Sequence, residues 1–389
     1  MKKAKLLIFP GYFVPHLGGL ETHTDEFSKY MPSENYDISI FAPNIPKSKE
    51  FEIRHGFVKV YRYPAFELIS NYPVPNIFNL RFWKILSDAY LLKPDIVMTR
   101  TRFFSNTLLG LIYAKFRSKP KKLIHVEHGS DFVKLENPIK NHLAYFYDIS
   151  VGKIIFKRSD SVIAISKAVH KFIKTNFLEK KDIPIIYRGM EIEEIEKIEK
   201  NLELAKKFEN KFKICFLGRL YKWKGVENII GAYSKLPEQI QKNTVLLIIG
   251  YGEDLERLKN LAGDYLDNGI YFLGKLDFKD AISAMKASDI YIHSSYPGGG
   301  LSSSLLQAMC SGKAIIASPH EGADEVIFED NTGILLPNNN EEEIKNGICK
   351  LYSNKQLINK YGTAAKLFLK ENFTWDSSIK QYIKILDRL

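Results

Sequence analysis

Residues 288–318 read SDIYIHSSYPGGGLSSSLLQAMCSGKAIIAS. Two short apolar runs, Ile290–His293 and Ala314–Ala317, flank a glycine-rich turn and an apolar segment that favours a helix. A strand, a helix and a second strand in this order are typical of a parallel sheet with helices packed on its faces. This stretch therefore predicts an α/β fold.

The same alternation of strands and helices continues along the rest of the chain. The further strand-like runs are Lys5–Phe9, Ile38–Phe41, Ile96–Thr99, Leu123–His128, Ser161–Ile165, Lys213–Leu217, Val245–Ile249 and Ile270–Leu273. Between them, Val226–Leu236 repeats apolar residues at helical spacing, which predicts a helix facing the core. Because 389 residues are too many for one ordinary core, we expect two domains.

Composition changes between the two halves of the chain. We expect a Rossmann-like domain at residues 1–190 and a second one at residues 211–374. Residues 191–210 are rich in charge and are predicted to form an exposed helix and linker, and residues 375–389 a helix that can cross back to the first domain. In two parallel-sheet domains that face each other, the carboxyl ends of the strands border a shared cleft, where open α/β sheets bind their ligands.

Positive charge is concentrated in the first domain. Residues 1–190 hold 30 Lys and Arg against 17 Asp and Glu, a net charge of +13, whereas the remainder holds 26 against 28, a net charge of −2. This asymmetry favours a polyanionic partner, such as anionic lipid headgroups, a lipid-linked phosphate or nucleic acid. A lysine-rich solvated surface without a partner is the simpler alternative, and no recognisable nucleic-acid-binding module is present.

Targeting signals are not evident in the sequence. The apolar run Leu6–Phe9 ends at Pro10 and is too short for a secretory signal, and no stretch approaches the roughly 18 apolar residues that span a bilayer. The three cysteines are widely separated, and this spacing matches neither a disulfide framework nor a metal site. We expect a cytoplasmic protein.

Two loops of the second domain carry residues suited to phosphate binding. Arg219 and Lys224 follow the strand at 213–217, and a planar guanidinium and a point charge can converge there on one pyrophosphate. An ordinary surface ion pair is the alternative. Gly250 and Gly252 follow the next strand and would let the backbone approach a ligand, but the third glycine of the dinucleotide fingerprint is missing. That absence disfavours a nicotinamide or flavin dehydrogenase.

The most specific loop is the glycine-rich turn of the opening stretch. Gly298, Gly299 and Gly300 precede Leu301, Ser302 and an apolar helix. Free backbone amides, serine caps and the helix dipole would favour a phosphate or sugar oxygen at this point. A purely structural glycine turn is the alternative.

Two loops of the first domain are further candidates. Gly18 and Gly19 open a helix that carries Glu21 and His23, where glycine allows a substrate to approach the helix end. The segment 125–131 places His128 at the end of a strand and next to Glu127. A metal site is disfavoured there, since adjacent strand residues point to opposite faces. His128 is then either a hydrogen-bond partner of a sugar hydroxyl or a structural histidine.

Taken together, these segments resemble the retaining, family 4-type glycosyltransferases of the GT-B fold. The pieces that carry the resemblance, in chain order, are GGLETH, VEHGSDF, SDSVIAISKAV, FLGRLYKWKGVENIIGAY, IIGYGEDLERL, the opening stretch and EVIFEDNTGILLP. Each is weak alone, but seven ordered matches are specific. The resemblance implies transfer of a sugar from a nucleotide diphosphate sugar, UDP- or GDP-linked, to a glycan or lipid-linked acceptor of the cell envelope, without a metal or other cofactor.

The resemblance also implies roles for single residues. Arg219 and Lys224 match the pair that grips the donor diphosphate, and the loop Gly299–Ser302 matches the one whose amides hold the donor. His128 matches a histidine near the donor sugar. Gly18 and Gly19, ahead of Glu21 and His23, match the loop that borders the acceptor. The acceptor would be held mainly by the first domain and the nucleotide mainly by the second.

One departure from the family pattern concerns catalysis. The family has two glutamates eight positions apart, and the matching residues here are Gly299 and Gln307. Gln307 can still hydrogen-bond a ribose, but Gly299 lacks a carboxylate next to the reacting sugar. Glu321 or Glu325 could substitute for it. A non-catalytic homologue that acts as a binding or scaffold subunit is therefore the alternative function.

The basic first domain is expected to rest on an anionic membrane surface. Relatives that act on lipid-linked acceptors often use a basic surface with aromatic residues. The candidate segments here are Tyr72–Leu86 and Arg100–Lys122, which combine basic and apolar residues. The expected location is the cytoplasmic face of a membrane.

Overall fold

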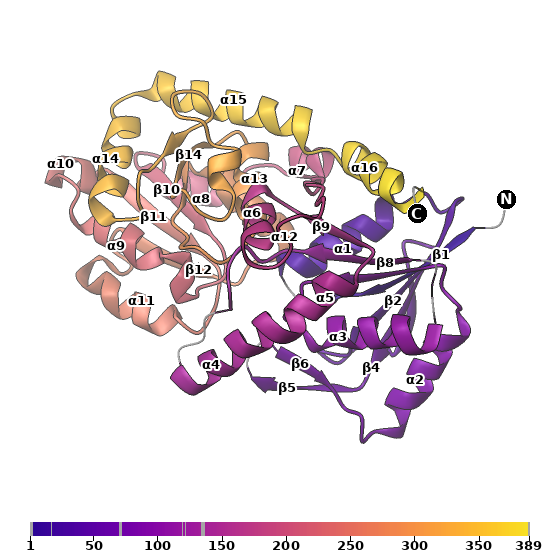
Figure 1. Ribbon diagram of the computed structural model, residues 1–389. Helices are drawn as coiled ribbons and strands as arrows, with labels where there is room; N and C mark the ends of the chain where they lie inside the picture. The colour runs from indigo at the N-terminus through magenta and orange to yellow at the C-terminus, as the bar shows by residue number, and fades with distance from the viewer. Residues whose placement is uncertain are drawn as a thin grey trace. The chain divides into compact units, whose positions relative to one another are not determined.

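The computed structural model describes residues 3–16, 18–69, 72–118, 120, 122–133 and 137–387. The chain divides into two compact units (Figure 1). The first unit comprises Met1–Gly189 together with Trp375–Leu389, and the second comprises Met190–Thr374. Each unit is an α/β structure with its own sheet.

The first unit is built on a seven-stranded sheet in the order β3-β4-β2-β1-β7-β8-β9. Neighbouring strands are parallel except β3 and β4. The strands are β1 (Ala4–Phe9), β2 (Tyr36–Pro43), β3 (Phe51–Arg54), β4 (Val58–Tyr63), β7 (Ile96–Arg100), β8 (Lys122–Glu127) and β9 (Ser161–Ala164). A separate antiparallel ribbon pairs β5 (Ala65–Ile69) with β6 (Tyr72–Pro75).

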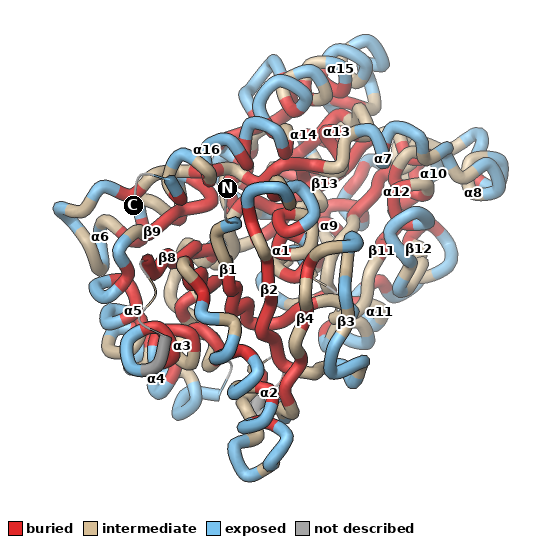
Figure 2. The backbone as a smooth tube through the Cα atoms, turned by 90° about the vertical axis from the view of Figure 1, so that its right-hand side faces the viewer, coloured by how far each residue is buried: buried red, intermediate tan, exposed pale blue. Residues whose placement is uncertain are grey.

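Helices cover both faces of this sheet because successive strand residues point to opposite sides. Leu6 and Ile8 of β1 face one core, and Leu7 and Phe9 face the other. The first core is closed by α1 (Gly19–Tyr30), α6 (Lys167–Asn176) and α16 (Trp375–Asp387), and the second by α2 (Leu80–Leu91), α3 (Ser105–Ile112) and α5 (Lys153–Arg158). The unit also contains α4 (Pro138–Tyr147) and two π-helical turns, η1 (Tyr113–Ser118) and η2 (Asp148–Gly152). In Figure 2 the tube along β1, β2 and β8 is mostly red, the colour of buried residues.

The last helix, α16, belongs to the first unit although it follows the second in sequence. Tyr382 packs edge-on against Phe27 of α1, with ring centroids 4.8 Å apart. Tyr36 at the start of β2 donates a hydrogen bond of 3.0 Å from its hydroxyl to Asp387 Oδ1. Residues 388 and 389 of the predicted final helix lie outside the described residues.

The second unit is built on a six-stranded, fully parallel sheet in the order β12-β11-β10-β13-β14-β15. The strands are β10 (Phe212–Leu217), β11 (Thr244–Ile249), β12 (Ile270–Gly274), β13 (Ile290–His293), β14 (Ala314–Ala317) and β15 (Ile334–Leu335). The helices are α7 (Ile192–Lys197), α8 (Leu202–Lys207), α9 (Val226–Ser234), α10 (Glu238–Lys242), α11 (Leu255–Ala262), α12 (Phe278–Ala287), α13 (Ser303–Cys310), α14 (Glu341–Tyr352) and α15 (Lys355–Asn372). Three 3₁₀ turns complete the unit: η3 (Lys222–Lys224), η4 (Gly263–Tyr265) and η5 (Ala323–Glu325).

The segment 191–210 differs from the exposed helix and linker that its charge suggested. It forms α7 and α8, which are part of the second unit. Ile195 is fully buried, and Lys286 of α12 donates hydrogen bonds from Nζ to the carbonyl oxygens of Ile195 (2.7 Å) and Ile198 (2.5 Å). The isoleucines at every third position therefore serve packing within the second unit rather than a linker.

Candidate functional site

The strand order of the second unit reverses between β10 and β13, which are neighbours in the sheet. Open α/β sheets bind ligands beyond the carboxyl ends of the strands at such a point. The loop after β10 carries Arg219 and Lys224, and the loop after β13 carries Gly298–Ser302. The topology thus gathers the predicted donor-binding residues at one edge of one sheet.

These two loops are hydrogen-bonded to each other. Ser294 donates from Oγ to the carbonyl oxygen of Lys224 (2.8 Å), and the amide of Tyr296 donates to the carbonyl oxygen of Trp223 (2.8 Å). Gly225 follows with φ of 63°, and a Cβ atom there would lie 2.1 Å from the carbonyl oxygen of Ser294. Only glycine fits this left-handed, crowded position, which fixes Lys224 next to the second loop.

Arg219 is held between two tyrosines. Its guanidinium carbon lies 5.1 Å from the ring centroid of Tyr221 and 4.7 Å from that of Tyr251. Nη1 donates to the hydroxyl of Tyr251 at 3.1 Å, and Nη2 donates to the hydroxyl of Tyr221. Stacking and hydrogen bonding together restrict the planar guanidinium to one orientation, which suits bidentate binding of phosphate oxygens.

Lys224 forms an ion pair with Glu321, one of the two carboxylates considered as substitutes. Nζ of Lys224 donates to Glu321 Oε2 at 2.7 Å and lies 4.2 Å from the ring centroid of Trp223. His293, the last residue of β13, places Nε2 3.6 Å from the same oxygen. Burial lowers the pKa of His293 to about 4, so this imidazole is neutral at physiological pH. The second candidate, Glu325, is buried in η5.

The glycine-rich loop leads into α13 as its sequence suggested. Gly298 has φ of 148°, a conformation that favours glycine, and Leu301 is buried. Ser302 is the residue before the helix, but its side chain makes no capping bond, which corrects the expected serine cap. Its Oγ lies 3.2 Å from Ser304 Oγ instead. Gln307 lies half-buried within α13.

Gly250 and Gly252 also have a structural reason for being glycine, and their approach to a ligand stays a prediction. A Cβ atom on Gly250 would lie 1.8 Å from the carbonyl oxygen of Gly218, and one on Gly252 would lie 2.2 Å from that of Leu220. The loop after β11 therefore packs directly on the loop that carries Arg219. Both glycines support the shape of the Arg219 loop.

In the first unit, His128 is buried and engaged on both ring nitrogens. Nε2 lies 3.1 Å from His23 Nδ1, and Nδ1 lies 3.1 Å from Thr101 Oγ1. Burial, followed by the nearby charge of Arg100, lowers the pKa of His128 to about 3, and burial also lowers the pKa of His23 well below its usual value. Both imidazoles are neutral at physiological pH. His128 can bind a sugar hydroxyl only by exchanging one of these contacts.

The carboxylate beside His128 is a structural anchor of the loop. Glu127 Oε1 accepts hydrogen bonds from the amides of His128 (2.9 Å) and Gly129 (2.7 Å), and Arg102 Nη1 lies 3.1 Å from the same oxygen. Burial alone would raise the pKa of Glu127, but Arg102 and the hydrogen bond from His125 hold it far below its ordinary value. The charge of Glu127 is thus satisfied by protein groups.

Gly18, the residue before α1, lies against a neighbouring carboxylate. A Cβ atom on Gly18 would lie 2.4 Å from Glu21 Oε2, and Glu21 Oε1 lies 2.6 Å from His16 Nδ1. His23 of the same helix stands near Trp375 of α16, with ring centroids 5.6 Å apart. The structure therefore brings His23 and His128 together, whereas Glu21 binds His16.

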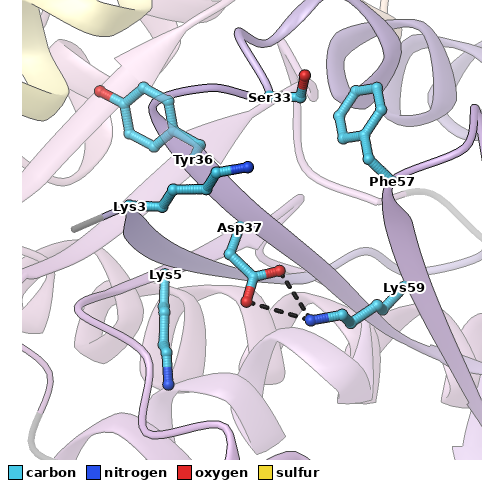
Figure 3. A pocket seen from close by; sticks show the side chains of 7 residues that line it. All are labelled: Lys3, Lys5, Ser33, Tyr36, Asp37, Phe57 and Lys59. Atoms are coloured by element: carbon cyan, nitrogen blue, oxygen red, sulfur yellow. Dashed lines mark hydrogen bonds and ion pairs between the residues drawn. The ribbon is translucent and has the colours of Figure 1, made fainter. Parts of the chain in front are cut away.

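A hollow of about 380 Å³ lies at the amino ends of the strands of the first sheet, at the far end of these strands from His128 (Figure 3). Its lining residues come from the amino ends of β1, β2 and β4 and their approaches, and they are Lys3, Lys5, Ser33, Tyr36, Asp37, Phe57 and Lys59. Asp37 accepts hydrogen bonds from Lys59 Nζ at 2.9 and 3.2 Å. Because α/β sheets bind ligands at the carboxyl ends of strands, this hollow takes no part in the candidate site.

Sequence reasoning missed an exposed apolar face on α4. Ile139, Leu143 and Phe146 are 73%, 64% and 64% exposed, and their spacing places them on one side of the helix. We call these three residues the α4 apolar face. Apolar residues at i, i+4 and i+7 were the available signal, but the same spacing also describes an ordinary buried helix.

The two segments proposed for membrane contact differ in which of their side chains are exposed. In Tyr72–Leu86, Phe78, Leu80 and Trp83 are strongly exposed, but Phe82 is core. In Arg100–Lys122, Arg100 and Arg102 are buried, whereas Ile112 and Phe116 are exposed, and residues 119 and 121 lie outside the described residues.

The described ranges contain neither a cluster of metal ligands nor a membrane-spanning helix. No group of three or more His, Cys, Asp or Glu side chains among these residues is placed to hold a metal ion. Within the same ranges, every helix is too short or too polar to cross a membrane.

Comparisons with known proteins show the family and the fold of the chain. The model of glycosyl transferases group 1 matches residues 197–368, and that of glycosyltransferase family 4 matches residues 17–194. An uncharacterized glycosyltransferase of Methanocaldococcus jannaschii is 66% identical over 390 residues and covers 100% of both chains.

Two more distant relatives extend the comparison. N,N'-diacetylbacillosaminyl-diphospho-undecaprenol alpha-1,3-N-acetylgalactosaminyltransferase of Campylobacter jejuni is 24% identical over 391 residues, with 97% of this chain and 94% of that protein covered. The crystal structure of Anabaena HepE in complex with UDP-glucose superposes with a TM-score of 0.75 at 20% identity and covers 99% of this chain and 100% of that chain. The family resemblance and the α/β fold are confirmed, and the chain belongs to the family 4-type glycosyltransferases of the GT-B fold.

Proposed function

We propose that this glycosyltransferase moves a hexose from a nucleotide diphosphate sugar to a glycan or lipid-linked acceptor with retention of the anomeric configuration. The observation that carries the proposal is the pairing of the Arg219–Lys224 loop with the glycine-rich loop at the point where the strand order reverses. The second unit would hold the donor, and the first unit would hold the acceptor.

The chemistry follows from where charge develops. When the sugar leaves the diphosphate, negative charge grows on the phosphate oxygens, and cations already placed there stabilise the transition state. Arg219 would hold two oxygens with its planar fork, and Lys224 would add a point charge. The acceptor hydroxyl would attack the sugar from the face that the diphosphate leaves. Because two side-chain cations serve the diphosphate, we propose that the reaction uses no metal ion or other cofactor.

The relatives support the classes of donor and acceptor. The Anabaena structure contains UDP-glucose, and the Campylobacter enzyme is named for an acceptor carried on diphospho-undecaprenol. A uridine or guanosine diphosphate sugar and a lipid-linked acceptor are therefore the substrates to test first. Both would carry phosphates, which suits a chain with a net charge of +11.

We propose that the first unit also contacts an anionic membrane at the cytoplasmic face. The α4 apolar face exposes three large side chains, and Lys140 is exposed on the same helix. Lys153 and Lys157 are exposed on the nearby α5. Apolar side chains that insert between headgroups and lysines that face them are the combination by which an interfacial helix binds anionic lipid.

The proposal is tested by offering the purified chain a panel of UDP-, GDP- and ADP-sugars together with a polyprenyl-diphosphate-linked sugar. We expect one donor to be consumed and its sugar to appear on the acceptor with unchanged anomeric configuration by NMR. An inverted product contradicts retention. If no donor is consumed, with or without acceptor, the transferase activity itself is contradicted.

A further inference from the structure

We propose that Glu321 supplies the donor-site carboxylate that Gly299 lacks. This inference rests on the proposed function, since it assigns a role in the same donor site. It concerns only residues of the second unit, and four independent observations support it.

The first observation is that Glu321 fills the space of a side chain at position 299. A Cβ atom on Gly299 would lie 2.1 Å from Glu321 Oε1 and 3.0 Å from its Cδ. Such distances are shorter than any van der Waals contact, so residue 299 and Glu321 cannot both extend a side chain into this space. The chain has one carboxylate here, contributed by the residue 22 positions further along.

The second observation is the set of groups around this carboxylate. Glu321 is buried, with Oε2 bonded to Lys224 Nζ at 2.7 Å and 3.6 Å from His293 Nε2. That imidazole nitrogen is buried and donates or accepts no hydrogen bond within the described part of the chain. A buried carboxylate, a lysine and an imidazole with unused hydrogen-bonding capacity form a polar recess, as a site for a hydroxyl-bearing ligand would require.

The third observation is the backbone conformation of Glu321. Its φ is 52°, in the left-handed region that glycine adopts easily and other residues rarely adopt. Residues held in such conformations persist where the surroundings require the particular side chain, and they gather at active sites. A glutamate at this position is explained if its carboxylate is needed.

The fourth observation is that Glu321 is tied to the glycine-rich loop. The amide of Ser302, at the start of α13, donates to the carbonyl oxygen of Glu321 at 3.2 Å. This bond ties the backbone of Glu321 to the glycine-rich loop, and the bond to Lys224 orients its carboxylate. Glu321 Oε2 would keep Lys224 directed at the diphosphate, and Oε1, which faces the space at Gly299, would accept a hydrogen bond from a hydroxyl of the donor sugar.

A reciprocal exchange of the two residues tests this inference. Glu321→Gly removes the carboxylate, and Gly299→Glu forces Glu321 away from Lys224. We expect each single variant to lower kcat/KM for the donor by about 100-fold, as when one preorganised group is lost from a transition-state site. The double variant Gly299→Glu/Glu321→Gly again has one carboxylate in this space without a clash, and we expect it to recover most of the lost activity.

Two further variants separate a role for the charge from a structural role. Glu321→Gln keeps the shape of the side chain and should still lower kcat, whereas Asp324→Asn alters an exposed carboxylate of the same turn and should leave kcat unchanged. Thermal melting confirms that each variant is folded. Full activity of Glu321→Gly and Glu321→Gln overturns the inference, as does a folded double variant no more active than either single variant. A wild-type chain that turns over no donor contradicts the proposed function instead, so the two failures are distinguishable.

Discussion

Gly299 and Glu321 exclude each other's side chains. A Cβ atom on Gly299 would meet Glu321 Oε1 at 2.1 Å, and this carboxylate is bonded to Lys224. The departure from the family pattern at position 299 is therefore accompanied by a carboxylate from another loop. This relationship favours an active transferase over a non-catalytic homologue.

The positive φ of Glu321 predicts that glycine is more stable than alanine at this position, although the proposed activity needs the glutamate. Glu321→Ala and Glu321→Gly both lose the ion pair with Lys224, but only glycine relieves the positive φ of 52°. We expect the free energy of unfolding of the second unit to be about 1 kcal/mol higher for the glycine variant than for the alanine variant. Urea denaturation of the two variants measures this difference. Equal stabilities would show that the conformation is not strained.

Buried neutral histidines predict a loss of stability in mild acid. The pKa values of His128 and His293 are lowered to about 3 and about 4, against about 6.5 in an unfolded chain. Between these values the unfolded chain binds more protons, so stability is complete above about pH 6.5 and falls as the pH drops towards 4. In this range the free energy of unfolding should fall by up to about 1.4 kcal/mol per pH unit for each histidine.

Thermal melting from pH 7.5 to pH 4.5 tests this expectation. His293→Gln should flatten the pH dependence of the melting temperature of the second unit, and His128→Gln that of the first. His142→Gln is the matched control, because this exposed ring remains in water when the chain unfolds. Identical pH profiles for all three variants and the wild type would show that neither His128 nor His293 causes the loss of stability in acid.

The buried ion network around Arg102 predicts a large effect of a single substitution. Arg102 lies 3.1 Å from Glu127 and donates to Asp148 at 3.1 Å, all three being buried. Replacing it with leucine leaves two buried carboxylates without their cation and should cost about 3–5 kcal/mol of stability in the first unit. Arg81→Leu, which breaks an exposed pair with Glu50, should cost less than about 1 kcal/mol. Similar losses in urea denaturation would contradict this account of the loop.

The α4 apolar face predicts binding to anionic vesicles. Ile139→Ser, Leu143→Ser and Phe146→Ser together should weaken co-sedimentation with such vesicles by about 10-fold or more, since the inserted apolar area is lost. Leu367→Ser, Leu261→Ser and Leu202→Ser together remove similar exposed area from the second unit and serve as control. The membrane proposal is contradicted if the wild type does not bind anionic vesicles at low salt. It is also contradicted if the α4 substitutions leave the binding unchanged.

Much of the fold could be predicted because buried parallel strands are continuous apolar runs. All ten predicted strands are present, with ends within two residues of those observed. Five strands were missed, namely β3, β4, β5, β6 and β15, and three of them show why. β4 alternates buried and half-buried residues at its start, β3 is a mostly exposed edge strand, and β15 has two residues. Such short or alternating segments give no apolar run to detect.

The candidate site could be predicted only where its residues follow one another in sequence. The loop with Arg219 and Lys224 and the glycine-rich loop were identified from local patterns. Contacts between distant loops were not: His23 meets His128 across 105 positions, and Tyr251 packs on Arg219. The sequence offers both Glu321 and Glu325 as substitute carboxylates and does not decide between them. The three-dimensional structure shows that the carboxylate of Glu321 is bonded to Lys224 and fills the space at Gly299.

The most direct test of the account is the rate at which donor sugars are released or transferred by the wild type and by Arg219→Ala/Lys224→Ala. The account predicts turnover of one nucleotide diphosphate sugar by the wild type and a loss of about 100-fold or more in the double variant. Lys222→Ala, an exposed lysine of the same loop, should remain within about twofold of the wild type, as expected of a surface substitution. Undiminished turnover by a folded Arg219→Ala/Lys224→Ala variant would contradict the proposed donor site.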